Sequence, residues 1–310
     1  MQFFKRDTHI DFMGKRMLAL IFSGTLIVIA LGSLVFRGLN LGIDFTGGTL
    51  VEVGFTQAVD LTPVREALAK DGFEDAVVQH FGTSKDVLMR LAPRPDMESA
   101  ALSDKAFKAM QRIDKGADLR RVEFVGPQVG DELIEDGGLA MLYALIGILI
   151  YVGLRFEYRF AVSSVLALVH DVIITIGFFA ATQVEFDLTV LAAVLAVIGY
   201  SLNDTIVVFD RIRENFRKIR KGETDEIINT SINQTLSRTL ITSGTTLLVL
   251  IALFLFGGEI IHAFAMALII GIGIGTYSSI YVASTTAAYM GISRADLVPV
   301  KKEEAIDELP

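Results

Sequence analysis

The stretch Gly199–Asn215, GYSLNDTIVVFDRIREN, closes a long apolar run that begins near Leu188. If this stretch is a helix, Asp204 lies about 10 Å along the helix axis before Arg211, where the charged residues at the end of the membrane span begin. That depth lies inside a hydrocarbon core about 30 Å thick. Inserting a carboxylate into the membrane at that depth costs about 2.5–3.5 kcal/mol of free energy, so Asp204 should face protein, water or a partner cation. Arg238, at the head of the next apolar run, is the candidate cation, and the sequence indicates membrane machinery built around this pair.

Composition places the chain among polytopic α-helical membrane proteins. Of its 310 residues 52% are hydrophobic, and the mean hydropathy is +0.53. Apolar runs of suitable length predict six transmembrane helices: Met17–Phe36, Leu139–Leu154, Phe160–Thr182, Leu188–Phe209, Leu240–Gly257 and Ile260–Met290. The chain has no cysteine, which excludes disulfides, thiolate metal sites and thiol catalysis.

Charges between the runs predict the orientation and four regions. Lys and Arg concentrate before the first run and in the loops after the second and fourth, whereas residues 183–187 and 258–259 hold none. The positive-inside rule therefore places both termini in the cytoplasm. A cleavable signal peptide is the rival interpretation of the start, but the apolar run is long and no A-x-A site follows it. The expected regions are a cytoplasmic start with the first helix (1–37), an exported domain (38–138), five further helices (139–292) and a cytoplasmic tail (293–310).

The exported region alternates strand and helix patterns. Strands are expected at Thr49–Thr56, Ala76–Phe81, Asp86–Leu91 and Leu119–Val125, and helices at Thr62–Asp71, capped by Thr62, and Met97–Ile113. The order β-α-β-β-α-β predicts a small α+β ferredoxin-like domain between helices one and two. With 12 basic and 18 acidic residues from Arg37 to Gly138 it carries about −6 and no basic run, which argues against nucleic acid as a partner.

Polar residues recur at helical spacing inside three of the later runs. The third run carries Ser164, Asp171 and Thr175, with His170 beside Asp171. The fourth carries Ser201, Asp204 and Thr205, with Asn203 between them. The fifth carries Thr235, Arg238, Thr242 and Thr245, predicted as a hydroxyl stripe that leads inward from the cation.

Two interpretations of these polar positions remain open. A carboxylate balanced between desolvation and a nearby cation can change charge when its access changes, which makes Asp204, Arg238, Asp171 and His170 candidates for a proton or ion path. Ser201, Asn203, Thr205 and Thr242 would support that path. The alternative is a static ion pair that only fixes helix register. Asp210 and Glu214 are expected to form a solvated rim.

Glycines in this chain predict packing and bends in preference to a nucleotide site. Gly271–Gly275 (GIGIG) follows no strand, so close helix packing through small residues is the better interpretation. Gly42, Gly47 and Gly48 are expected to form the bend from the membrane into the exported sheet. The sequence contains no Walker A loop, so ATP hydrolysis is not the expected energy source, and no cofactor is expected. One charge crossing 100 mV is worth about 2.3 kcal/mol, enough to drive a conformational step.

Four ordered motifs give the chain a family resemblance. GIDFTGG (42–48), FVGPQVG (124–130), IGYSLNDTIVVFDRIRENFRKIRKG (198–222) and LSRTLITSGTTLLV (236–249) together resemble the SecD/SecF family of protein-export membrane subunits, within the RND superfamily. The resemblance covers essentially the whole chain. It implies half of an RND-type transporter, with an exported domain between the first two of six helices.

The resemblance also implies function and partners. It implies an inner-membrane subunit, not an enzyme, that pairs with SecD, associates with SecYEG and YajC, and uses the proton-motive force to draw preprotein out after SecA has pushed it in. By motif, the family's proton-passage charges fall on Asp204 and Arg238. The rival functions are a non-conducting scaffold of the translocase and a small-molecule RND-type exporter, for which the exported region is too small. The coupling ion, proton or sodium, stays open.

Overall fold

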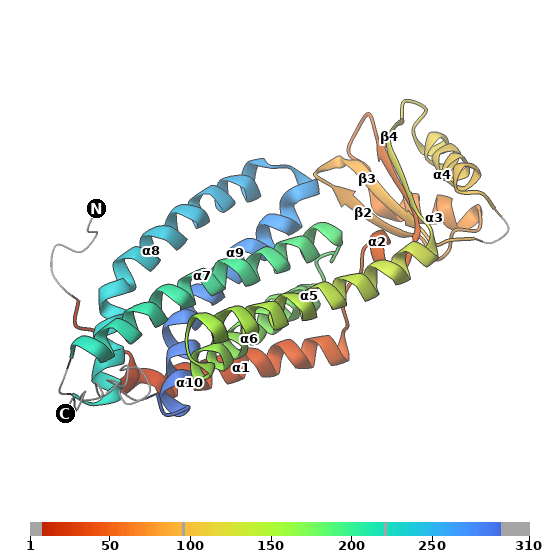
Figure 1. Ribbon diagram of the computed structural model, residues 1–310. Coiled ribbons are helices and arrows are strands. Elements are labelled where there is room, and N and C mark those ends of the chain that lie inside the picture. Colours follow the sequence, from red (N-terminus) through yellow and green to blue (C-terminus); the bar gives the residue numbers. More distant parts are fainter. Residues whose placement is uncertain (1–7, 95–96, 220–221, 293–310) are drawn as a thin grey trace, which may run out of the picture.

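The computed structural model describes residues 8–94, 97–219 and 222–292 and divides the chain into a long helical bundle and a small α/β domain at one end of it (Figure 1). The opposite end of the bundle carries Arg155, Arg211 and Lys218 and is called the basic end below. Lys5, Arg6, Arg220, Lys221 and the tail 293–310, which entered the orientation and domain predictions, lie outside the described residues.

Six helices are long and apolar enough to cross a membrane, as predicted. They are α1 (Arg16–Phe36), α5 (Pro127–Arg155), α6 (Tyr158–Thr182), α7 (Leu188–Lys218), α8 (Thr224–Phe256), and the last, made of α9 (His262–Ser278), a π-helical turn (Ser279–Ala283) and α10 (Ser284–Tyr289). Short 3-10 turns at Met13–Lys15 and Glu259–Ile261 precede the first and last.

Two of these helices begin well before their apolar runs. Helix α5 starts at Pro127, so residues 127–138 of the predicted domain range are helical. Helix α8 starts at Thr224, where the side chain of Glu223 and that of Glu226 form a capping box. Hydropathy detects only the part of a helix suited to hydrocarbon, so these polar first turns were missed.

The α/β domain has the predicted element order. Its strands are β1 (Gly48–Gly54), β2 (Val77–Phe81), β3 (Thr83–Leu91) and β4 (Asp118–Val125), and its helices α3 (Leu61–Lys70) and α4 (Ser99–Ile113). The antiparallel sheet has the order β2-β3-β1-β4, which is the ferredoxin-like arrangement. Val51 and Val53 alternate inward and pack with Leu68 and Leu102 of the helices. The cap of α3 is Asp60, whose carboxylate accepts from Thr62 N, so the prediction of Thr62 as cap is corrected.

The segment between α1 and β1 fixes the domain to the bundle. It contains α2 (Ile43–Thr46), a short helix that the sequence did not reveal. Gly42 N donates to Phe186 O at 2.9 Å, and Phe186 N donates to Asn40 O at 2.8 Å. A Cβ on Gly130 of α5 would lie 2.6 Å from Phe45 O, so the start of α5 packs directly on α2. Gly47 and Gly48 have φ of 67° and 130°, which favours glycine and agrees with the predicted bend.

An ion pair reinforces this junction. Arg90 of β3 lies 2.5 Å from Glu185 in the α6–α7 loop, and its other nitrogen donates to Leu41 O at 2.7 Å. Burial raises the pKa of Glu185, and nearby Asp187 adds to the rise, while Arg90 and a hydrogen bond from Gln79 lower it by less. The folded state therefore binds this proton more tightly than the unfolded state does.

We expect this carboxyl to make the protein less stable as pH rises. Between the unfolded pKa and the higher folded pKa of Glu185 the folded state holds more protons, so stability falls with increasing pH across that window. Glu185→Gln should flatten this part of the thermal-midpoint profile between pH 4.5 and pH 8, measured in detergent. Glu66→Gln on the exposed face of α3 is the control. A profile unchanged by Glu185→Gln would contradict the expectation.

Small residues bring α9 against α7, which confirms the packing predicted for Gly271–Gly275. A Cβ on Gly271 would overlap the side chain of Val197, and one on Gly275 would lie 2.9 Å from Ser201 Cβ. Gly273, between them, faces open space. The i, i+4 pair of glycines thus sets the close approach of the two helices that carry most of the polar groups.

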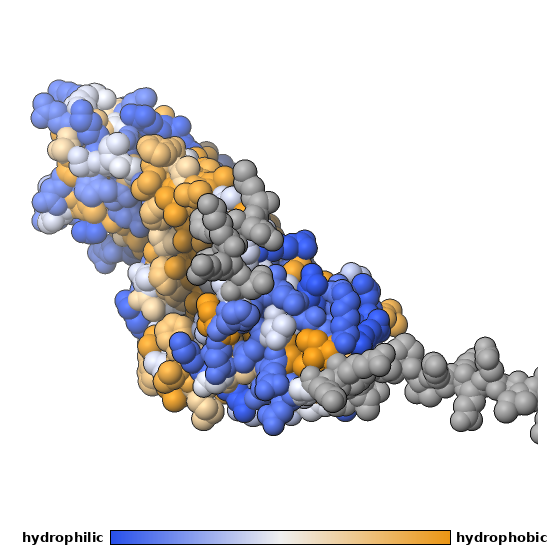
Figure 2. Space-filling model, turned by 90° about the vertical axis from the view of Figure 1, so that its left-hand side faces the viewer, coloured by the Kyte–Doolittle hydropathy of each residue, from blue (hydrophilic) through white to orange (hydrophobic). Residues whose placement is uncertain are grey.

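The outer faces of the bundle remain apolar. Large exposed side chains gather on α1, α5 and α8, among them Leu18, Leu154, Leu248 and Phe256. Figure 2 shows hydrophobic atoms between two hydrophilic regions, the α/β domain and the basic end. This distribution fits a bundle surrounded by lipid, with both ends in water.

Candidate functional site

Asp171 is a buried carboxylate with hydrogen-bond partners on three helices. It is 0% exposed. Its Oδ2 accepts from Ser201 of α7 at 2.6 Å and from Ser278 of α9 at 2.7 Å. Its Oδ1 lies 2.9 Å from Nδ1 of His170. One carboxylate therefore ties three helices together at the middle of the bundle.

Asp204 forms a second buried centre, on α7 and α8. It is 3% exposed. Its Oδ2 accepts from Ser243 of α8 at 3.3 Å, and Ser243 accepts from Thr276 of α9 at 2.8 Å. The carboxylate therefore faces protein, as a charge in a membrane-spanning helix requires.

The two centres belong to one polar layer. Ser201 and Asp204 lie three residues apart on α7, so they project from neighbouring parts of one face. Thr276 and Ser278 lie two residues apart on α9 and reach one centre each. The layer therefore crosses α6, α9, α7 and α8 at a single depth. The sequence identified both carboxylates, but it did not reveal Ser243, Thr276 or Ser278 as their partners.

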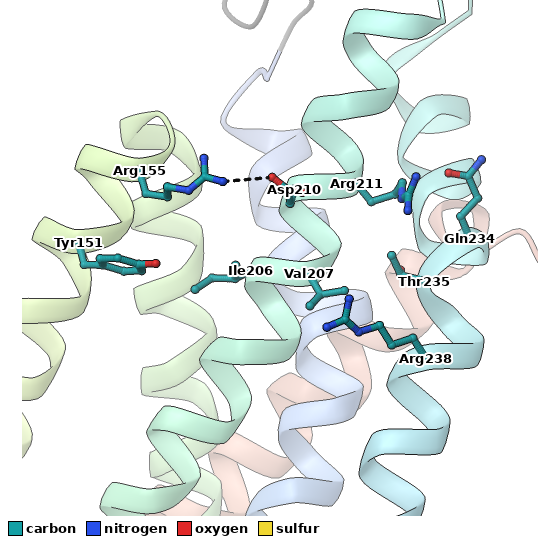
Figure 3. Close-up of a pocket in the computed structure, with 9 residues that line it drawn as sticks. All are labelled: Tyr151, Arg155, Ile206, Val207, Asp210, Arg211, Gln234, Thr235 and Arg238. Carbon is teal, nitrogen blue, oxygen red and sulfur yellow. Dashed lines mark ion pairs between the residues drawn. The ribbon is translucent and has the colours of Figure 1, made fainter. Parts of the chain in front are cut away.

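Arg238 lies nearer the basic end than the polar layer. It precedes Ser243 by five residues on α8, about 7.5 Å along the helix axis. It extends from α8 toward Val207 of α7 (Figure 3). Among the described residues no ion pair joins it to Asp204, although the guanidinium is near enough for its charge to act on that carboxylate. Asp204 and Arg238 are therefore close but do not form a salt bridge in this conformation.

The guanidinium of Arg238 lines a pocket between α5, α7 and α8 at the basic end (Figure 3). The pocket has a volume of about 340 Å³. Its other lining residues are Tyr151, Arg155, Ile206, Val207, Asp210, Arg211, Gln234 and Thr235. Asp210 and Arg155 form an ion pair of 3.7 Å across its mouth. Arg238 is exposed at this pocket.

The predicted hydroxyl stripe of α8 needs correction. Thr242 donates to Arg238 O at 2.9 Å and Thr245 to Ile241 O at 2.9 Å, so both satisfy their own helix and lie away from the buried face. The buried stripe follows an i, i+4 spacing instead: Ser231, Thr235, Thr239 and Ser243. Counted from Thr235 at i+3, i+7 and i+10, the predicted stripe shares only Thr235 with that buried face, and its i+3 position, Arg238, is exposed.

The remaining predicted residues divide between core and rim. Thr205 is buried, whereas Asn203 is exposed and lies outside the polar layer. Glu214 pairs with Arg211 at 2.8 Å and Lys218 at 2.5 Å at the basic end. Within the described ranges no group of three or more His, Cys, Asp or Glu side chains could hold a metal ion. The layer offers carboxylate and hydroxyl oxygens, which can bind a proton and exchange hydrogen bonds.

Comparison with known proteins agrees with this architecture. The family model "Protein export membrane protein SecD/SecF, C-terminal" matches residues 105–293, and the "SecD/SecF GG Motif" model matches residues 32–59. A protein translocase subunit SecF of Vibrio alginolyticus is 54% identical, with 100% of this chain and 99% of the relative covered. One from Escherichia coli O157:H7 is 47% identical, with 95% and 92% covered.

A solved structure shares the fold. The crystal structure of SecDF, a translocon-associated membrane protein from Thermus, superposes with a TM-score of 0.83 at 38% identity and covers 92% of this chain. The chain spans 39% of that protein's length. A second structure, SecDF in a super-membrane-facing form, gives a TM-score of 0.70.

Fold and site together define a multi-pass α-helical membrane protein with buried carboxylates and one α/β domain between its first two long helices. Within that class, the matched models and relatives show that the chain belongs to the SecD/SecF family of protein-export membrane proteins.

Proposed function

We propose that this subunit, paired with SecD, uses the proton-motive force to promote late translocation of preproteins across the cytoplasmic membrane. The observation that carries the proposal is the polar layer, in which Asp171 and Asp204 are held by hydroxyls from neighbouring helices. Short hydroxyl contacts let a carboxylate gain or lose a proton with small side-chain rotations. The role is that of a motor component and not of an enzyme.

The partners follow from the same proposal. The 39% share of the SecDF chain leaves room for a second half, which SecD would supply. The exposed guanidinium of Arg238 and the pocket beside it would face that half. SecYEG, YajC and SecA would be contacted within the assembled translocase, and unfolded preprotein would meet the α/β domain. By the positive-inside rule the basic end faces the cytoplasm and the domain faces the periplasm.

Asp204→Asn tests the proposal. The amide keeps the size and the bond to Ser243 but cannot release a proton at neutral pH, so proton flux through the reconstituted complex with SecD should fall at least tenfold. Flux is measured with a pH-sensitive dye enclosed in vesicles under an imposed potential. Asp136→Asn, at an exposed position near the start of α5 and outside the pocket, is the matched control. Equal flux in the wild type and Asp204→Asn, with the complex intact, would favour the scaffold function instead.

A further inference from the structure

Four buried hydroxyls among the described residues of the bundle have no hydrogen-bond partner, those of Ser164, Thr205, Thr239 and Thr285, and the first two are considered together here. Most hydroxyls on these helices donate to a carbonyl of their own helix, as Thr175 does to Asp171 O at 2.7 Å. Ser164 of α6 and Thr205 of α7 are both 0% exposed, and neither has a hydrogen-bond partner within the described part of the chain. Buried polar groups are almost always paired, so an unpaired couple needs an explanation.

The two hydroxyls lie on the contact faces of α6 and α7. Helices α6 and α7 touch at Asp171–Ser201, 2.6 Å apart, and again at the rings of Phe160 and Phe209, whose centroids are 4.6 Å apart. Ser164 lies one turn from Phe160, and Thr205 lies one turn from both Ser201 and Phe209. Both side chains therefore lie between these two contacts, in the same interface and at nearly the same depth.

The surroundings suit a water molecule. Ser164 and Thr205 share an interface without bonding each other, so their oxygens are farther apart than a direct hydrogen bond allows. Neighbouring Ala161 and Ala167 of α6 are small and buried. Thr285 of α10, which packs against α6, is a third buried hydroxyl without a partner in the described residues. A polar site with two or three such groups is what a buried water requires.

An aromatic barrier separates this place from the basic end. Phe160 packs against Phe209 and also against Phe156, whose ring centroid is 5.9 Å away. Phe160 and Phe209 are both 0% exposed. On the other side lies Asp171, whose neighbours are His170 on its own helix, Ser201 on α7 and Ser278 on α9. The hydroxyls of Ser164 and Thr205 therefore lie between Asp171, which can bind a proton, and the hydrophobic barrier formed by Phe160 and Phe209.

We propose that Ser164 and Thr205 bind water that carries protons between Asp171 and the basic end, and that the Phe160–Phe209 pair is the gate closing this route in the conformation described. The inference rests on the proposed proton-driven function and adds a route that does not pass through Arg238. Ser164 and Thr205 are positioning residues for the water, and Asp171 is the group that exchanges the proton.

Thr205→Val tests the water site in the complex with SecD. Valine matches threonine in shape but lacks the hydroxyl, so proton flux should fall about tenfold, and Thr205→Ser should keep it near the wild-type rate. Thr175→Val is the matched control, because Thr175 is equally buried but bonds to its own helix. Its flux should be unchanged.

Silver labelling provides a readout of hydration itself. The natural chain has no cysteine, so a Thr205→Cys variant carries one thiol. Ag⁺ reaches thiolates only through water. Silver added at the basic end during proton flux, when the proposed gate opens, should block flux in Thr205→Cys but not in Thr175→Cys. Phe209→Leu, which loosens the barrier, should raise the labelling rate severalfold.

The outcomes separate this inference from the function on which it rests. If Asp204→Asn abolishes flux while Thr205→Val leaves it unchanged, the water site is overturned and the proton-driven function stands. If neither substitution changes flux, the function fails and the inference falls with it. Thr205→Cys that is intact and insensitive to silver also overturns the water site.

Discussion

Asp171→Ala is expected to yield a protein that no longer supports proton-driven export and that unfolds at a markedly lower temperature. The substitution leaves Ser201, Ser278 and His170 without their shared acceptor. Interhelical hydrogen bonds in membranes contribute about 0.6–1.7 kcal/mol each, so the two interhelical bonds lost here, to Ser201 and Ser278, amount to roughly 1–3 kcal/mol. Translocation should fall at least a hundredfold, because the layer loses one of its two proton-binding groups.

The measurements are thermal unfolding in detergent, followed by size-exclusion recovery, and preprotein export into vesicles. Asp171→Asn separates the two effects, because the amide oxygen can still accept from the serines while the side chain no longer titrates. It should recover much of the stability and none of the flux. Asp136→Asn, at an exposed position near the start of α5, should match the wild type in both assays. Wild-type export by a well-folded Asp171→Asn would show that Asp171 only fixes the helices.

Gly271→Leu is expected to force α9 away from α7 and to destabilise the bundle. Even a Cβ at this position overlaps Val197, and leucine adds three more carbons. Overpacking a close-packed interface costs about 1–3 kcal/mol and occasionally more, and the close approach of backbones here places the cost at the upper end. Because Thr276 and Ser278 lie on the same helix, their bonds to the polar layer should lengthen as well.

Gly273→Leu is the control for this prediction, since it makes the same change on the same helix but faces open space. It should leave the unfolding temperature and the export rate near those of the wild type. Equal losses in the two variants would mean that the α7–α9 contact does not explain the effect.

Sequence reasoning performed well wherever the physical requirement is local. An apolar stretch long enough to cross a bilayer, a period-2 strand or a glycine pair at i, i+4 is visible in a short window, so the six helices, the order of the α/β domain and the packing at Gly271–Gly275 were predicted. It performed worse at polar helix starts, such as Pro127 and Thr224, where hydropathy gives no signal. The small helix α2 is too short to produce a periodicity.

The candidate site shows the same division. An ionisable residue in an apolar run is conspicuous in the sequence, because placing a charge in the membrane costs free energy. For that reason Asp171, Asp204 and Arg238 were found. Their partners were not found, because many hydroxyls occur on these helices and only packing selects a few of them. Periodicity alone could not rank Thr242 against the adjacent Ser243, since one residue of helix rotation turns a side chain by about 100°.

The amino-acid sequence by itself therefore determined that the chain crosses a membrane, how many times, and which charges lie inside. Tertiary structure alone decided that Asp204 bonds to a serine and not to Arg238, that Asp171 holds three helices, and that Ser164 and Thr205 are buried without a partner among the described residues. The physical reason is that burial of a helix depends on its own composition, whereas a hydrogen bond depends on the rotation and depth of two helices distant in sequence.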